Sequence, residues 1–84
     1  MDGASLTLVA RVRSLKMSSA QGRAHPTEVD CEWQVVRSSS GELLLQLSTY
    51  GSDTRQSQPK VSQTVQLDLD TCEELVRIIR ANMR

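Results

Sequence analysis

The chain has 84 residues, of which 38% are hydrophobic and 24% are charged, and its ten basic and ten acidic residues cancel. A chain of this length forms a single domain over residues 1–84, and it buries only about 60–65% of the surface that its unfolded form exposes. The charge balance excludes the overall basic excess that is typical of nucleic-acid-binding domains. The first residues lack a signal-peptide pattern, and no apolar run approaches the roughly 20 residues of a membrane helix. We therefore expect a cytoplasmic protein with no membrane partner.

The first predicted element is a strand over about residues 5–16, after about four flexible N-terminal residues. Apolar residues alternate along this strand and so share one face of it. They are Leu6, Leu8, Ala10 and Val12. Arg11 and Arg13 lie on the opposite face. Residues 17–28 show no periodicity and contain Gly22 and Pro26, so they are predicted to form a loop.

Three more strands are predicted over about residues 29–37, 42–50 and 61–67. The run Ser38–Gly41 is a short polar connection that predicts a hairpin between the first two of them. One face of the sheet then carries Val29, Cys31, Trp33, Val35, Leu43, Leu45, Leu47, Val65 and Leu67. The polar segment 51–60 is long for a hairpin turn and is the loop best suited to a functional role.

The last predicted element is an amphipathic helix over about residues 69–83. Its apolar residues recur at helical spacing, and Asp68 or Asp70 can cap its first turn. The apolar residues are Cys72, Leu75, Val76, Ile79 and Met83. The predicted fold class is α+β, with an antiparallel four-stranded sheet and one C-terminal helix packed on it.

Residues that could carry catalysis are scarce in this sequence. The single histidine, His25, precedes Pro26 in a predicted loop, without an acid or a nucleophile nearby in the sequence to orient it. Two cysteines, Cys31 and Cys72, cannot supply the three or four ligands of a zinc site. We interpret them as buried thiols, with a redox bridge between them as the alternative. We therefore expect no enzymatic activity, no metal and no cofactor.

The opposite face of the sheet is rich in hydrogen-bonding side chains. It collects Arg11, Arg13, Gln34, Gln46, Ser48, Tyr50, Ser62, Thr64 and Gln66. Tyr50 either shields its neighbours at a strand end or stacks on a base, and Trp33 is either a core residue or a second stacking ring. The face itself is either an ordinary solvated surface or a path for a phosphate backbone.

Two segments carry a resemblance to a known family. The stretches Leu43–Tyr50 and Val65–Asp70, followed by a helix through Met83, resemble in order and spacing the single-stranded-DNA-binding domain of the transcriptional positive cofactor four family and its small bacterial relatives. The resemblance covers about residues 29–83. It implies a curved antiparallel sheet, a homodimer built partly through the C-terminal helices, and single strands bound along the sheet.

The leading hypothesis is a homodimeric module that binds single-stranded nucleic acid or takes part in transcription. The residues predicted to contact the nucleic acid are Arg11, Arg13, Trp33, Arg37, Tyr50, Arg55 and Lys60. The alternative is a small dimeric protein-interaction module, regulatory or antitoxin-like, that binds no nucleic acid. In that case the outward apolar residues Val9, Val36 and Leu44 would contact the partner.

Overall fold

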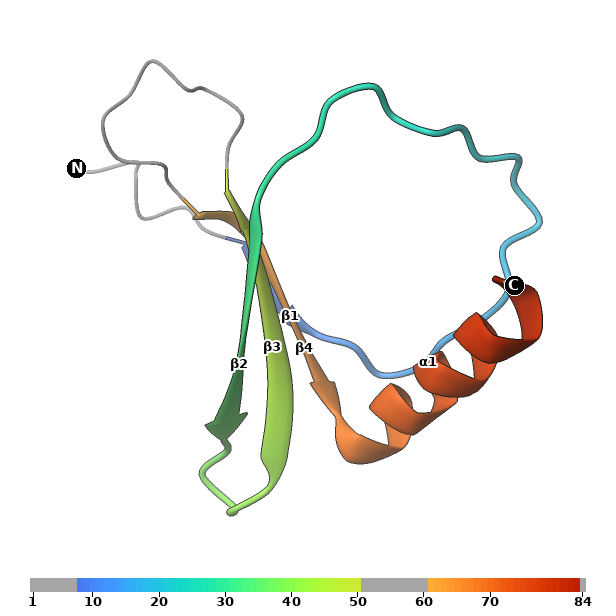
Figure 1. The fold of residues 1–84 in the computed structure, drawn as a ribbon. Coiled ribbons are helices and arrows are strands. Elements are labelled where there is room, and N and C mark those ends of the chain that lie inside the picture. The colour runs from blue at the N-terminus through green and yellow to red at the C-terminus, as the bar shows by residue number, and fades with distance from the viewer. Residues whose placement is uncertain (1–7, 51–60, 84) are drawn as a thin grey trace.

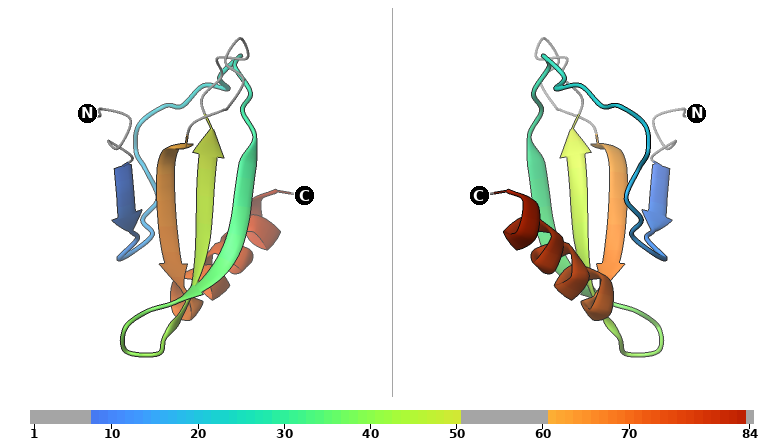
Figure 2. Two further views of the ribbon diagram at one scale, coloured as in Figure 1. Left: turned by 90° about the vertical axis from the view of Figure 1, so that its left-hand side faces the viewer. Right: turned by 90° about the vertical axis from the view of Figure 1, so that its right-hand side faces the viewer.

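The computed structural model describes residues 8–50 and 61–83. Four strands, β1 (Leu8–Arg11), β2 (Cys31–Arg37), β3 (Leu43–Tyr50) and β4 (Val61–Asp68), form one sheet in the order β1-β4-β3-β2. The helix α1 (Leu69–Asn82) follows β4 directly and lies on one face of the sheet (Figure 1, Figure 2). This arrangement confirms the predicted α+β class with one C-terminal helix packed on a four-stranded sheet.

The sheet is mixed, so the prediction of an entirely antiparallel sheet was wrong. β1 runs parallel to β4, with Leu8 paired to Gln63 and Arg11 paired to Gln66. The two other strand pairs are antiparallel. The direction of β1 is not set by a hairpin, because the chain leaves β1 and crosses to the far edge before it enters β2 (Figure 2). The sheet is also not strongly curled, in contrast to the curved sheet that the resemblance implied (Figure 1).

β1 is shorter than the predicted strand over residues 5–16. The backbone N–H of Val12 still donates to the carbonyl of Gln66 at 2.8 Å, and beyond it the described chain has no regular structure until β2. Alternating apolar residues therefore continue past the point where a neighbouring strand is present to pair with them. Residues 5–7 of the predicted strand lie outside the described residues.

The hairpin between β2 and β3 is closed by its serine and glycine residues. The N–H of Ser38 donates to the carbonyl of Glu42 at 2.7 Å, and the Ser38 hydroxyl accepts the N–H of Glu42 at 3.1 Å. Gly41 has φ of 90°, a conformation that costs an L-residue energy because of its Cβ. The turn therefore depends on glycine at this position.

Strand pairing divides the described side chains between two faces of the sheet. We call the first the apolar face; it carries Trp33, Val35, Leu43, Leu45, Leu47, Val65 and Leu67. We call the second the polar face; it carries Arg11, Glu32, Gln34, Gln46, Ser48, Tyr50, Thr64 and Gln66, together with Val9, Val36 and Leu44. The assignment of residues to faces follows the alternation seen in the sequence.

The helix begins at a well-formed cap. The carboxylate of Asp68 accepts the backbone N–H of Thr71 at 2.8 Å, and this hydrogen bond lowers the pKa of Asp68 below its ordinary value. At the other end, the N–H of Met83 donates to the carbonyl of Ile79. Of the two cap candidates, Asp68 is therefore the residue used. No helix in the described part of the chain has the length and apolar character needed to span a membrane.

The hydrophobic core is small. Among the described residues, Leu44 and Leu67 are the buried hydrophobic side chains, exposed by 4% and 5%. Within those residues α1 contacts β3 and β4 but not β2, so Trp33 is 71% exposed and Val35 is 56% exposed. The prediction that Cys31 is a buried thiol was wrong, because it also lies on this uncovered strand.

The chain is extended for its mass. Its accessible surface is 7,599 Å², whereas a compact monomer of this mass exposes about 5,000 Å². Its radius of gyration is 15.2 Å, against about 12 Å for a compact domain of this length. Part of this surface belongs to residues 12–30, which form no strand or helix and are mostly exposed.

Candidate functional site

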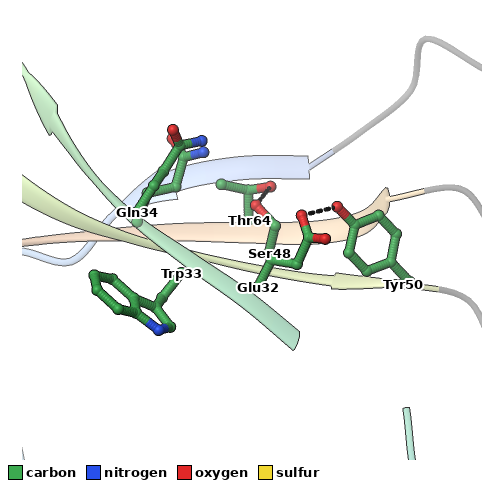
Figure 3. A pocket seen from close by; sticks show the side chains of 7 residues that line it. Glu32, Trp33, Gln34, Ser48, Tyr50 and Thr64 are labelled. Atoms are coloured by element: carbon green, nitrogen blue, oxygen red, sulfur yellow. Dashed lines mark hydrogen bonds between the residues drawn. The ribbon is translucent and has the colours of Figure 1, made fainter. Parts of the chain in front are cut away.

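An open groove of about 460 Å³ is lined by Trp33 and by six residues of the polar face. Seven residues from β2, β3 and β4 line it, and Figure 3 labels six of them. They are Glu32, Trp33, Gln34, Gln46, Ser48, Tyr50 and Thr64. The chain has one tryptophan, one tyrosine and no phenylalanine, so all of its aromatic side chains line this groove.

The floor of the groove is built from side chains that bond across the strands. The hydroxyls of Ser48 and Thr64 are 3.0 Å apart and buried, and the amide of Gln66 donates to the Gln46 oxygen at 2.8 Å. Each pair joins residues that are directly opposite in the β3–β4 register. The hydrogen bonds hold these groups in place, which gives the groove a fixed polar floor.

Tyr50 and Glu32 form the end of the groove. The phenol of Tyr50 donates to a carboxylate oxygen of Glu32 at 2.5 Å (Figure 3). This hydrogen bond to the carboxylate raises the pKa of Tyr50 above 10.0. The contact fixes the ring at the groove, and it leaves the second carboxylate oxygen of Glu32 able to accept a hydrogen bond from a ligand.

Trp33 lies at the rim of the groove. It projects from the other side of β2 than Gln34 does (Figure 3), as expected for neighbouring residues of a strand. Because β2 is an edge strand, the indole is reached both from the groove and from the apolar face. The core interpretation of Trp33 was wrong, and its exposed ring is free to stack.

None of the predicted basic residues within the described part of the chain lines the groove. Arg11 extends from β1 across β4 to Glu42, with which it forms an ion pair. Arg37 donates to the carbonyl of Gly41 in the hairpin at 2.9 Å. Arg13 is exposed in the segment after β1. Arg55 and Lys60 lie outside the described residues.

The apolar residues predicted to contact a protein partner on the polar face divide into two groups. Val9 is 59% exposed, whereas Val36 is partly covered and Leu44 is buried. Leu44 therefore belongs to the packing of the sheet. The prediction that Leu44 contacts a protein partner was wrong, because its side chain is buried. The alternation along the strand assigns a side chain to a face of the sheet but does not show whether other residues cover it.

Sequence reasoning did not foresee the role of Glu32. The sequence marks Glu32 only as an acidic residue with the parity of the polar face, whereas the structure places it against Tyr50. The strand register carries the missing signal, since Glu32 pairs with Ser48 and the next polar-face residue along β3 is Tyr50.

The chemistry available in the groove is that of hydrogen bonding and aromatic stacking. It presents a carboxylate, primary amides, hydroxyls and two rings. Within residues 8–50 and 61–83, no three His, Cys, Asp or Glu side chains gather as metal ligands do. His25 lies in the segment before β2, where its ring accepts the N–H of Thr27 at 3.1 Å.

Comparisons with family models, with curated proteins and with solved structures gave no match for this chain. The resemblance to the positive cofactor four family therefore rests on the pattern of its segments.

Proposed function

We propose that the chain is a binding module for single-stranded nucleic acid, and that the groove on the polar face is its binding site. The observation that carries this proposal is the position of the aromatic residues. In a chain with two such residues, both line one open groove whose remaining walls are amides, hydroxyls and a carboxylate. Aromatic rings beside hydrogen-bonding groups are what exposed bases require.

In this proposal the bases enter the groove. Tyr50 and Trp33 stack on base faces, and each stacked base contributes about 1–3 kcal/mol. Gln34 and Gln46 offer amide donors and acceptors to base edges, and Glu32 accepts from an exocyclic amino group. Glu32 also repels phosphates, so the backbone runs outside the groove.

The phosphates then pass along the arginine side chains that border the sheet. Arg37 has guanidinium N–H groups beyond the one donated to Gly41, and Arg13 is exposed after β1. Arg11 is paired with Glu42 and is the weaker phosphate ligand of the three. Few phosphate contacts predict a shallower salt dependence than that of strongly basic proteins.

The test is a titration of the purified protein with a labelled single-stranded oligonucleotide and with its duplex, followed by fluorescence anisotropy. Trp33 is the single tryptophan, so quenching of its emission reports stacking in the same titration. Tyr50→Ala is expected to weaken single-strand binding by about 10-fold or more, given the stacking energy. Arg77→Gln, an exposed position on α1, is the control that should bind as the unmodified chain does.

Binding of duplex as strongly as single strand would contradict base stacking in the groove. So would single-strand binding that Tyr50→Ala leaves unchanged. No binding at tens of micromolar protein would refute the proposal as a whole.

A second candidate, a protein-interaction module, is favoured by the uncovered apolar surface. Val35 and Leu43 on the sheet, with Val76 and Ile79 on α1, are each more than 40% exposed. The two candidates use opposite faces, so single substitutions separate them. Val76→Glu should impair binding of a protein partner and leave nucleic-acid binding intact, whereas Tyr50→Ala should do the reverse.

A further inference from the structure

We propose that the free edge of β2 pairs with β2 of a second copy of this chain, in an antiparallel register centred on Gln34. The two sheets then form one continuous sheet. This self-association does not depend on nucleic-acid binding, and its test uses the protein alone.

The first observation is the direction of the backbone groups of β2. In the hairpin, Tyr50 N–H bonds to the Asp30 carbonyl at 3.1 Å and Ser38 N–H bonds to the Glu42 carbonyl at 2.7 Å. Hydrogen-bonded pairs alternate along antiparallel strands. The even-numbered residues of β2 therefore bond to β3, and the N–H and C=O groups of the odd-numbered residues point outward. These are Cys31, Trp33, Val35 and Arg37.

The second observation is that this edge lacks the usual protection. β2 is the terminal strand of the sheet, it is seven residues long, and it contains no proline, lysine or register shift. Its charged residues are engaged within their own subunit, Glu32 with Tyr50 and Arg37 with Gly41. Exposed Trp33 and Val35 flank the outward backbone groups.

The third observation identifies a second copy as the partner, because the strand is complementary to itself. With the two-fold axis at Gln34, Trp33 lies opposite Val35 of the other copy and Cys31 lies opposite Arg37. Outward-pointing residues then meet outward-pointing residues, so their N–H and C=O groups pair. Each Trp33 gains an aromatic to β-branched contact, a favourable cross-strand pair, and no like charges face each other.

The surface of the chain is consistent with this pairing. Trp33 and Val35 on β2 are 71% and 56% exposed, so the pairing covers apolar surface that the isolated chain leaves open. The net charge of zero means that two copies do not repel each other as a whole.

The first experiment measures the mass of the purified protein by analytical ultracentrifugation over a range of concentrations. The unmodified chain is expected to be a dimer. Val35→Pro removes an outward N–H and no hydrogen bond within the sheet, so it should give a folded monomer. Val35→Thr keeps the N–H and the branched side chain, and should remain a dimer. A monomeric unmodified chain, or a folded Val35→Pro variant that remains a dimer, would overturn the proposal.

The second experiment tests the register by disulfide formation, and it does not require the proline variant to fold. In a chain carrying Cys31→Ser and Cys72→Ser, the substitution Gln34→Cys places two cysteines opposite each other at the two-fold axis. Residues in such a non-hydrogen-bonded pair have Cα atoms about 4.5 Å apart, within the range of a disulfide.

Gln34→Cys is therefore expected to form a covalent dimer under mild oxidation. Glu32→Cys on the same strand and Gln46→Cys on β3 are the matched controls, because neither lies opposite its own copy. Equal cross-linking of Glu32→Cys and Gln34→Cys would contradict the register. Absence of cross-linking by Gln34→Cys would refute the pairing.

Discussion

Replacing Leu67 by alanine should be among the most damaging single changes in this chain. Leu67 is one of the two buried hydrophobic side chains in the described residues, and it faces α1 from β4. The substitution removes about three methylene equivalents, or roughly 2.4 kcal/mol of transfer free energy. The space left behind adds to that cost and brings such changes to about 2–5 kcal/mol.

The surroundings of Leu67 place the expected cost at about 3 kcal/mol, near the lower part of that range. An apolar crevice of about 230 Å³ already borders Leu67 and is open, so the new space joins solvent instead of becoming a sealed cavity. A chain of this length has a free energy of unfolding of roughly 4–12 kcal/mol. The melting temperature should therefore fall by about 15 °C.

The assay is thermal and urea unfolding followed by circular dichroism at one protein concentration, because dimerisation would make stability depend on concentration. Leu69→Ala is the matched control, because it removes the same atoms from a side chain that is 65% exposed. It should cost less than about 1 kcal/mol. Equal losses for the two variants would refute the inference that Leu67 belongs to the hydrophobic core.

Three further predictions concern groups outside the core. The pKa of Asp68 is lowered in the folded chain. The ionised carboxylate therefore stabilises the fold at pH values above its ordinary pKa of 3.8, and this stabilisation is lost as the pH falls through the lowered pKa. Asp68→Asn should flatten this part of a plot of melting temperature against pH. Because the pKa of Tyr50 is raised, the stabilisation that its protonated phenol gives to the fold is fully present below pH 10.0 and is lost as the pH rises through the raised pKa. Ultraviolet titration of this single tyrosine should show the shift, and Glu32→Ala should move it back toward 10.0. Gly41→Ala forces a side chain into a positive φ and should lower the free energy of unfolding by about 1–2 kcal/mol in urea titrations, whereas Ser39→Ala in the same turn should change it little.

The alternation of side chains made the faces of the sheet predictable from the sequence. A period of two residues assigns Leu45 and Gln46 to opposite faces wherever the strand pairs. The helix was equally predictable, because its apolar spacing and the aspartate before it are local signals. Three of the four strands begin or end within about two residues of the expected positions.

The partner of β1 and the cover over each face were not predictable in this way. Nothing local in Leu8–Arg11 distinguishes a parallel from an antiparallel neighbour, since that choice depends on β4 far along the chain. Trp33 and Cys31 looked like core residues because their parity is that of the leucines. They are exposed because α1 contacts β3 and β4 and leaves β2 uncovered. The alternation of side chains along a strand does not show which strands the helix reaches.

The candidate site was predictable in part. The polar-face parity brought Gln34, Gln46 and Tyr50 together on the sequence alone, and the structure places all three at the groove. The pairing of Tyr50 with Glu32 required the strand register, which depends on the length of the hairpin. The arginines were grouped by charge, and charge alone did not show that Arg11 is held by Glu42.

The placement of β1 has a consequence for how the chain folds. β2, β3, β4 and α1 follow one another in sequence and pair with their immediate neighbours, whereas β1 must find β4 across more than half of the chain. Pairing between distant segments is slow because the intervening chain must first be closed into a loop. The hairpin and helix therefore assemble first and β1 docks last. Local unfolding should follow the reverse order and release β1 first, so the amide hydrogens of β1 should exchange with solvent before those of β3.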